Sequence, residues 1–223
     1  MHWTTKDQDS TEAPTRARDP GAAGADPDPV FVDAIERLRC LLDEARRRGL
    51  EGGDTASLAT ADADGRPSVR TVTVPEVDAA GPVFFVDARS GKGQQLADNP
   101  RAALCFFWPG LRYQVSIEGA VVALDAARAD HLWARRGRDQ QLAAWIRDME
   151  PDTAGESGNG GRRLRIGHDF AWQRVARPES WRCLVLRPEL LRFWPVGWRN
   201  PRPRVEYARH REGAWRKRSW PAL

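Results

Sequence analysis

The sequence predicts an α+β protein in which one helix precedes a meander of antiparallel strands and further helices interrupt that meander. Apolar residues recur at helical spacing from Phe31 to Ala45, and short alternating segments separated by turn residues follow. Ten tryptophans and seven phenylalanines supply large apolar side chains for a core. Because closure removes exposed sheet edges, we expect about six or seven antiparallel strands in a small barrel with peripheral helices.

The first ordered element is expected to be a helix that begins at Asp28 and Pro29, an N-cap acid followed by proline at the first helical position. Gly49 is expected to end this helix. Residues 1–27 are rich in polar and small residues and show no apolar period. We therefore expect a disordered leader over 1–27 and a single domain over 28–223.

The remaining elements follow from alternation, capping residues and breakers. Shorter helices are expected over residues 90–99, 125–136 and 139–149, and a glycine-containing mobile loop over 151–163. The Glu212-Gly213 pair predicts the last turn. Strands are expected over 55–61, 68–77, 82–86, 102–108, 113–124, 181–186, 190–194, 205–209 and 214–219.

Composition argues against several classes of function. The 35 basic and 31 acidic residues give a net charge of +4, and the arginines are spread along the chain, so we expect no nucleic-acid partner. No apolar run reaches the roughly 18 residues of a membrane span, and no apolar signal segment is visible. Cys40, Cys105 and Cys183 form no C-x-x-C pair and lie in apolar stretches, which predicts reduced, buried thiols in a cytoplasmic protein.

Self-contained catalytic motifs are absent from the sequence. It contains no G-x-S-x-G, H-E-x-x-H, Walker or Rossmann pattern, and its four histidines are too scattered to propose as a metal site. We therefore expect no metal and assign no catalytic residue.

A series of short segments has an order that resembles one known family. The segments are Asp64-Gly65-Arg66-Pro67-Ser68-Val69-Arg70, Val83-Phe84-Phe85-Val86-Asp87, Ser90-Gly91-Lys92-Gly93, Asn99-Pro100-Arg101, Tyr113-Gln114-Val115, Leu191-Arg192-Phe193-Trp194, Arg204 and Gly213-Ala214-Trp215. They resemble the pyridoxamine 5′-phosphate oxidase family over essentially all of residues 28–223. The resemblance implies an FMN-binding split β-barrel of Greek-key topology that acts as a homodimer.

The resemblance also implies which residues hold FMN at the subunit interface. Arg70, Ser90 and Lys92 match positions that hold the flavin phosphate, and two cations with a hydroxyl suit a dianion. Gln114 matches a side chain that hydrogen-bonds the isoalloxazine edge. Trp181 and Arg204 match residues that close the site from the partner subunit, whereas Trp194 taken singly is more often a core residue. The complete expected set is Arg70, Thr71, Val72, Phe85, Val86, Ser90, Lys92, Gln114, Trp181 and Arg204.

Some flavin positions depart from the family pattern. Phe85 and Val86 stand where the family often has tyrosine and threonine, and Gly91 replaces an arginine that Arg89 could substitute for. Met149 and Glu150 replace a Gln-Ser pair. These differences predict a lower affinity for FMN than is typical of the family.

The substrate positions depart further. A pyridoxamine 5′-phosphate oxidase needs a lysine where this chain has Pro75, and a phosphate-binding tyrosine where it has Leu132. Asn200 and Arg202 replace an arginine and a histidine. Only Arg136 matches a phosphate ligand, since Gln140 replaces a serine. Each lost charge-assisted bond is worth about 1.5–3 kcal/mol, so we expect the chain to have lost vitamin B6 phosphate binding.

The replacement residues suggest a different ligand. Arginines could meet a carboxylate, and Trp133 and Trp198 offer flat apolar faces, although Trp198 and Arg199 could equally pack on the dimer surface. The resemblance is to the phenazine-biosynthesis branch, which oxidises dihydrophenazine carboxylic acids. The expected substrate set is Arg136, Gln140, Trp198, Arg199, Asn200 and Arg202.

These observations lead to an FMN-dependent oxidase of a secondary metabolite as the main hypothesis. The substrate would give a hydride to flavin N5, and dioxygen would reoxidise the flavin. Three alternatives stay open: an authentic pyridoxamine 5′-phosphate oxidase with a drifted pocket, a non-catalytic barrel that binds flavin or haem, and a deazaflavin-dependent reductase. The matches at Arg70, Lys92, Gln114 and Arg204 speak against the last of these.

Overall fold

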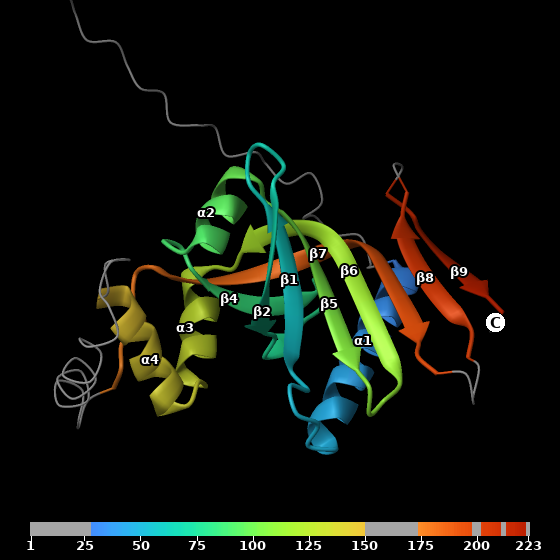
Figure 1. The fold of residues 1–223 in the computed structure, drawn as a ribbon, viewed down its shortest axis with the longest axis horizontal. Helices are drawn as coiled ribbons and strands as arrows, with labels where there is room; N and C mark the ends of the chain where they lie inside the picture. Colours follow the sequence, from blue (N-terminus) through green and yellow to red (C-terminus); the bar gives the residue numbers. More distant parts are fainter. Residues whose placement is uncertain (1–27, 150–173, 198–201, 211–212, 222–223) are drawn as a thin grey trace, which may run out of the picture.

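A computed structural model describes residues 28–149, 174–197, 202–210 and 213–221 (Figure 1). It confirms the α+β class, with an antiparallel sheet and four helices. The predicted leader 1–27, the loop 151–163 and Glu212 lie outside the described residues. The elements are α1 (Pro29–Arg47), β1 (Thr55–Ala61), β2 (Pro67–Thr73), β3 (Glu76–Val77), β4 (Pro82–Asp87), α2 (Gly91–Asp98), β5 (Arg101–Trp108), β6 (Tyr113–Ala123), α3 (Ala126–Ala134), α4 (Arg138–Met149), β7 (Trp181–Pro195), β8 (Arg204–Arg209) and β9 (Trp215–Trp220).

The strands form one sheet in the order β2-β1-β5-β6-β7-β4-β3, and β8 pairs with β7 and β9 with β8. Only Val74 and Pro75 separate β2 from β3, which stand at the two ends of this path, so the sheet curls back on itself. Arg46 of α1 donates hydrogen bonds to the carbonyls of Val74 at 2.9 Å and Pro75 at 2.6 Å. The segment between β2 and β3 is therefore hydrogen-bonded to the first helix.

Three of the predicted strands are divided or joined in the structure. The strand expected over 68–77 is divided into β2 and β3 at Pro75, which has no backbone N–H for a ladder. The strands expected over 181–186 and 190–194 are instead one strand, β7, with a register shift opposite Glu118 and Gly119 that accommodates Pro188. Nine strands result in the described part of the chain, as many as the strand ranges expected from the sequence, because one range is divided and two are joined. The six or seven strands expected in the barrel were too few.

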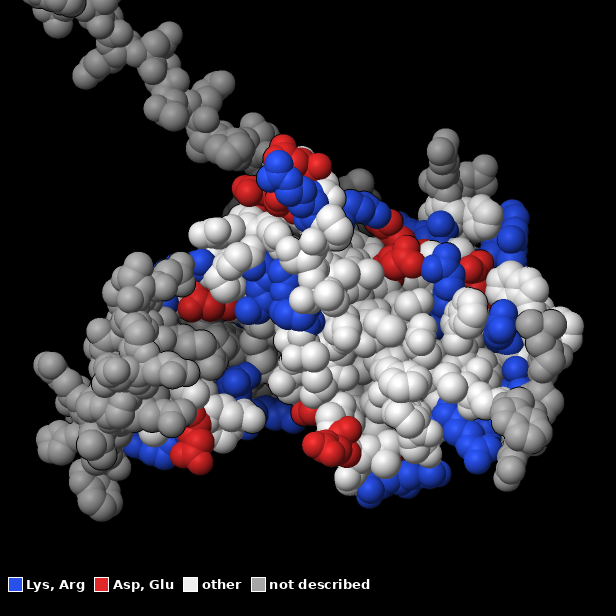
Figure 2. All heavy atoms as spheres, in the orientation of Figure 1, with Lys and Arg blue, Asp and Glu red and all other residues white. Residues whose placement is uncertain are grey.

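The outer face of the middle strands carries small and apolar side chains. Ser57 on β1, Cys105 on β5 and Ser116 on β6 are neighbours in register. Phe107 and Val69 are 57% and 71% exposed. Figure 2 shows a broad area without charged side chains over the middle of the sheet. A face of this kind is unusual for a surface that stays in water.

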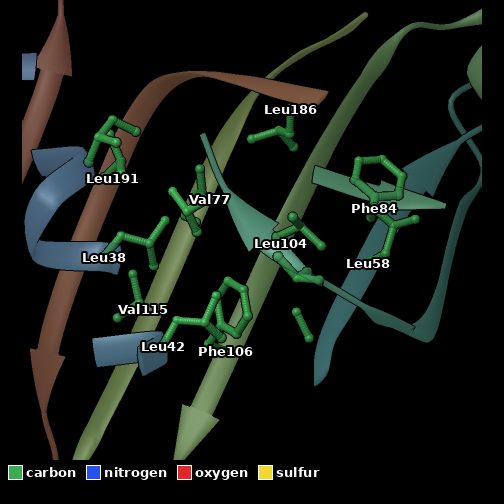
Figure 3. Packing of buried hydrophobic residues seen from close by; sticks show 14 of the residues in the cluster. Leu38, Leu42, Leu58, Val77, Phe84, Leu104, Phe106, Val115, Leu186 and Leu191 are labelled. Carbon is green, nitrogen blue, oxygen red and sulfur yellow. The ribbon is translucent and has the colours of Figure 1, made fainter. Parts of the chain in front are cut away.

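The inner face of the sheet packs against α1. Asp28 accepts a hydrogen bond from the backbone N–H of Val30 at 2.9 Å and caps the helix, as predicted. Leu38 and Leu42 project from α1 toward Phe106, Val115 and Leu191 of the strands (Figure 3). Gly49, with φ +60°, follows the helix and provides the left-handed conformation that ends it.

A second, smaller core lies under α3 and α4. Trp133 of α3 and Trp181 of β7 pack in it, 5.0 Å apart between ring centroids. The indole N–H groups of Trp133 and Trp145 each donate to a backbone carbonyl, of Val175 and Ala176 respectively, at 2.7 Å. These contacts attach the two helices to the end of the sheet where β7 begins.

The cysteines confirm the sequence prediction only in part. All three are free thiols, and burial raises the pKa of Cys183 to about 12. Cys40, however, is exposed, because it lies on α1 away from the buried row that contains Leu38 and Leu42. In the part of the chain that the structure describes, no helix is long and apolar enough to cross a membrane, and no group of three or more His, Cys, Asp or Glu residues could hold a metal.

Candidate functional site

Three groups of predicted site residues are found in the structure, and the first surrounds Arg70 on β2. The Arg70 guanidinium donates to Thr60 Oγ1 at 2.5 Å and to Gln95 Oε1 at 3.0 Å. Gln95 belongs to α2, so these bonds connect β2 to that helix. Burial lowers the pKa of Arg70. An anion placed beside this guanidinium would offset the cost of burying its charge.

The second part of this group is the N-terminus of α2. Ser90 is the N-cap: its hydroxyl donates to the Asp87 carbonyl at 2.6 Å and accepts from the Gly93 N–H at 3.3 Å. Lys92 is half-buried in the first turn. Arg89 pairs with Asp87 at 3.3 Å. A helix N-terminus with cations beside it suits a phosphate. We call the three residues Arg70, Ser90 and Lys92 the phosphate group.

The strand residues expected beside the flavin present mainly backbone. Val72 and Val86 are 8% and 4% exposed, and both side chains belong to the core, so neither can contact a ligand through its side chain. Thr71 is exposed. Among the described strands β2 pairs only with β1, which leaves the other edge of its backbone outside the ladder. This edge presents backbone N–H and C=O groups that could bond a ligand.

The second group lies around Gln114, at the start of β6. Gln114 is the cross-strand neighbour of Trp194 on β7, which is 39% exposed. The Arg204 guanidinium lies over the Trp194 ring, 4.4 Å from its centroid. We call Gln114, Trp194 and Arg204 the ring group. Trp194 was not among the predicted site residues, although its position next to inward-facing Phe193 on a strand could have indicated that it faces outward.

Trp181 does not join the ring group. It begins β7 and Trp194 nearly ends it, so the two indoles lie at opposite ends of a 15-residue strand. Trp181 is 5% exposed and stacks on Phe85, 4.5 Å between centroids. Within one chain, the structure therefore does not place Trp181 beside Arg204, because β7 is one continuous strand.

The third group joins Arg136 to these buried rings. The Arg136 guanidinium lies 4.7 Å from the centroid of Phe85 and 5.7 Å from that of Trp181. Gln140 is exposed on α4, and Leu132 is 3% exposed and packs in the second core. Phe85 is only two residues before Asp87, whose carbonyl binds Ser90. The Arg136 group and the phosphate group therefore share the end of β4.

The other predicted substrate residues lie elsewhere or outside the described part. Arg202, just before β8, lies over the ring of Tyr113, 5.6 Å from its centroid. The helices α3 and α4 and the strand β8 stand at opposite ends of the fold (Figure 1), so one chain does not bring Arg136 and Arg202 together. Trp198, Arg199 and Asn200 lie outside the described residues.

Comparison with known proteins gives matches to one family. A family model described as pyridoxamine 5′-phosphate oxidase matches residues 42–166, more than half of the chain. The chain belongs to this family. A pyridoxine/pyridoxamine 5′-phosphate oxidase from Maricaulis maris is 43% identical over 157 residues, which are 69% of this chain and 69% of the relative. The enzyme of the same name from Anaeromyxobacter dehalogenans is 37% identical over 187 residues, 84% of this chain and 94% of the relative.

Two solved structures share the fold of this family member. PhzG from Burkholderia lata, solved in complex with tetrahydrophenazine-1-carboxylic acid, has a TM-score of 0.76 at 22% identity and covers 86% of this chain and 96% of its own. A pyridoxamine 5′-phosphate oxidase-related, FMN-binding protein from Nostoc punctiforme has a TM-score of 0.65 at 20% identity, covering 82% of this chain and 96% of its own. At these identities the likeness concerns the fold.

Proposed function

We propose that this protein is an FMN-dependent oxidase of an aromatic or polycyclic carboxylic acid, with two copies of the chain completing each site. The observation that carries the proposal is the placement of Arg136. Its guanidinium lies over the rings of Phe85 and Trp181, at the strand end that also holds the N-terminus of α2. A cation for the substrate's acid thus stands next to a group suited to a flavin phosphate.

The described residues fit FMN at both ends of that cofactor. In the phosphate group, Arg70 and Lys92 supply positive charge, and the α2 N-terminus supplies backbone N–H donors. In the ring group, Gln114 offers an amide for the polar edge of the isoalloxazine, and Trp194 offers an exposed flat face. The two groups are complementary in chemistry, since the phosphate group suits a dianion and the ring group suits a flat ring with polar edges.

Two copies are proposed because these sets lie apart in one chain. In Figure 1 the helix α2 and the strand β8, which carries Arg204, stand at different ends of the sheet. The area without charged side chains on the outer face of the sheet lies between them (Figure 2). Its row of small side chains, Ser57, Cys105 and Ser116, would allow a second sheet to approach closely. Such a homodimer would bring the ring group of one copy to the phosphate group of the other.

Within the site, the residues of the chain bind and orient rather than transfer protons. Arg70, Ser90 and Lys92 would hold the FMN phosphate, and the bound flavin would supply two-electron redox chemistry, in which the substrate loses two electrons and two protons and dioxygen gains both to become hydrogen peroxide. Arg136 would hold the substrate carboxylate. Dehydrogenation toward an aromatic ring needs little help from a general base, which agrees with the lack of a self-contained catalytic motif.

The choice of substrate class depends on what replaced the vitamin phosphate clamp. Leu132 is buried in the second core and cannot bind phosphate. Pro75 offers no cation, and its carbonyl accepts a hydrogen bond from Arg46. Arg136 is retained and rests on aromatic rings. PhzG, which shares the fold, holds a polycyclic acid in its crystal structure, and we extend that substrate class to this chain as part of the proposal.

A second candidate, pyridoxamine 5′-phosphate oxidase activity, is favoured by the names of the relatives. The Maricaulis maris and Anaeromyxobacter dehalogenans proteins that bear that name are 43% and 37% identical to this chain. The substitutions at Pro75 and Leu132 argue against it, because they remove a cation and a hydroxyl from the phosphate position.

The deciding experiment is anaerobic reduction of the FMN-loaded protein by two substrates. We expect a dihydrophenazine carboxylic acid to bleach the flavin absorbance and pyridoxamine 5′-phosphate to leave it unchanged. Bleaching by pyridoxamine 5′-phosphate with formation of the aldehyde would establish the second candidate. Protein that stays colourless after incubation with FMN would refute both.

Arg136→Gln provides the matched variant for this experiment. It should raise KM for the acid about tenfold or more, because a charge-assisted bond is lost, while the affinity for FMN stays unchanged. An unchanged KM would remove Arg136 from the proposed substrate site.

A further inference from the structure

A cleft of about 380 Å³ opens between the end of α1 and the turn that joins β5 to β6. Leu41 of α1, together with Leu111, Pro195 and Val196, contributes apolar wall. Arg112 and Arg202 reach the same cleft from two different segments. The cleft thus combines an apolar wall with converging guanidinium groups.

The arginine side chains of this region lie around Tyr113. Arg202 lies over its ring at 5.6 Å, and Arg37 of α1 lies nearby over Phe193 at 4.7 Å. Burial alone would raise the pKa of Tyr113, but hydrogen bonds from Arg202 and Arg37 outweigh burial and lower it. The surroundings of this hydroxyl therefore favour negative charge.

Acidic residues do not neutralise the cleft. Glu44 is the carboxylate that lines it, and both Arg47 and Arg48 on the same helix already form ion pairs with Glu44. Within the described ranges, no ion pair involves Arg112 or Arg202. The cleft is left with an excess of positive charge that a bound anion would balance.

The backbone holds Arg112 at the rim in an uncommon conformation. Its φ of 57° lies in the left-handed region, which residues other than glycine seldom adopt. The Arg112 carbonyl accepts a hydrogen bond from the Val196 N–H at 2.8 Å, which ties the β5–β6 turn to the segment after β7. Two walls of the cleft are thereby joined, and such fixed geometry favours a preformed site.

We propose that this cleft binds a small organic oxyanion, a carboxylate or phosphate carried on an apolar body. Arg112 and Arg202 would bind the oxyanion as paired donors, and the wall formed by Leu41 and Val196 would cover the body of the ligand. The cleft lies on the other side of the sheet from the ring group, because Tyr113 and Gln114 are successive residues of β6 and point to opposite faces. The proposal therefore does not rest on the proposed oxidase activity. Arg202, which was expected in the substrate set, lies over Tyr113 and lines this cleft.

Calorimetric titration of the full chain, with and without excess FMN, tests this site. The probes are benzoate, acetate, inorganic phosphate and benzamidine, the last being a cation with the same ring as benzoate. We expect benzoate or phosphate to bind in both conditions, and benzoate to bind more tightly than acetate. Binding of phosphate without benzoate would identify the ligand as a phosphate, and the reverse would identify a carboxylate. Equal binding of benzamidine, or no binding of either anion, would overturn the proposal.

Variants locate the bound anion. Arg112→Gln and Arg202→Gln should each weaken binding about tenfold, as expected for loss of one charge-assisted bond. Tyr113→Phe removes only a hydroxyl, so it tests whether the anion lies beside Tyr113 without altering side-chain packing. Arg66→Gln, in an exposed turn, should leave the affinity unchanged. Loss of binding in Arg70→Gln with no effect of Arg112→Gln would place the anion in the phosphate group and refute the cleft.

Discussion

The guanidinium of Arg204 lies 4.4 Å from the ring centroid of Trp194, and the backbone of Trp194 pairs with that of Gln114 on the next strand. This contact gathers one amide, one flat ring and one cation at a single edge of the molecule. Trp181, at the other end of the same strand, is covered by Phe85 and Trp133. The two tryptophans of β7 therefore have different environments, and substitution should separate their roles.

Replacing each of these tryptophans by alanine should give opposite results. Trp181→Ala removes a buried ring and should lower the free energy of unfolding by about 3–5 kcal/mol. Trp194→Ala, at an exposed position, should change stability little but weaken FMN binding. Urea unfolding and flavin fluorescence titration measure the two effects. A Trp194→Ala protein that binds FMN as well as the parent would exclude this residue from the flavin site.

The residues of the phosphate group, Arg70, Ser90 and Lys92, should account for much of the affinity for FMN. Arg70→Gln and Lys92→Gln should each raise the Kd for FMN about tenfold or more, because each loses a charge-assisted bond to the phosphate. Riboflavin, which lacks the phosphate, should bind the parent and both variants with similar affinity. Arg66→Gln is the matched control, since this arginine is exposed in the β1–β2 turn. If riboflavin affinity fell as far as FMN affinity, the role assigned to these cations would be wrong.

The area without charged side chains on the outer face of the sheet should be the contact between two copies. Phe107→Asp places a charge at a side chain that is 57% exposed in the single chain, so the fold should survive. Light scattering should then give the mass of one 25.0 kDa chain and an FMN affinity well below that of the parent. Ala79→Asp, in the exposed turn before β4, should leave the mass unchanged. A parent protein that is already monomeric would contradict this prediction.

Acid should weaken the connection between α1 and the last two strands. Asp33 accepts hydrogen bonds from Lys217 at 2.7 Å and from Tyr207 at 2.8 Å, and these bonds lower its pKa below the usual 3.8. Their contribution to stability is present above pH 3.8 and is lost as the pH falls through the folded-state pKa. Because the Asp33–Lys217 pair is about half exposed, it should contribute less than about 1 kcal/mol.

Lys217→Met tests this connection. The variant should be less stable than the parent at pH 7, and the difference should shrink below about pH 3.8. Thermal unfolding at a series of pH values measures it, with Arg216→Met on the exposed neighbour as the control. A difference in stability that stays constant down to pH 2 would show that Lys217 acts through packing of its stem.

Gly119 should be intolerant of any side chain. A Cβ at this position would lie 2.0 Å from the Arg187 carbonyl oxygen, which is backbone and cannot move away cheaply. Gly119→Ala should therefore destabilise the protein by about 1–3 kcal/mol or more. Gly137→Ala, where nothing lies within 4 Å of the added carbon, should be tolerated. Equal unfolding midpoints for these two variants would show that the bulge in β6 and β7 is adjustable.

Local rules predicted most of the fold. The N-cap residues Asp28, Ser90 and Asp125 all begin helices in the structure, because a capping oxygen acts on backbone within three residues. The strand boundaries were less well predicted. Two strands were expected, over 181–186 and 190–194, yet β7 is continuous through Pro188, because the register shift that leaves Glu189 without a partner interrupts the ladder next to the proline, which has no N–H to donate.

The site was harder to predict because its parts come from distant segments. The sequence predicted that Arg70, Ser90 and Lys92 act together, and the structure connects the two elements that carry them, β2 and α2, through the hydrogen bond from Arg70 to Gln95. The choice of Trp181 over Trp194 depended on which end of a long strand each one occupies. That information comes from the register of β6 on β7, which alternation along a single strand does not contain.

The Asp28 side chain connects the start of the first helix to the last strand of this fold. Its carboxylate caps the first helix and also accepts a hydrogen bond from the N–H of Trp215 at 3.0 Å, across 187 residues of chain. Contacts between such distant residues form late and slow the search for the native state. During synthesis on the ribosome, this hydrogen bond cannot form until Trp215 has emerged. A chain that ends before the β8–β9 hairpin would therefore lack the hydrogen bond that Trp215 donates to Asp28.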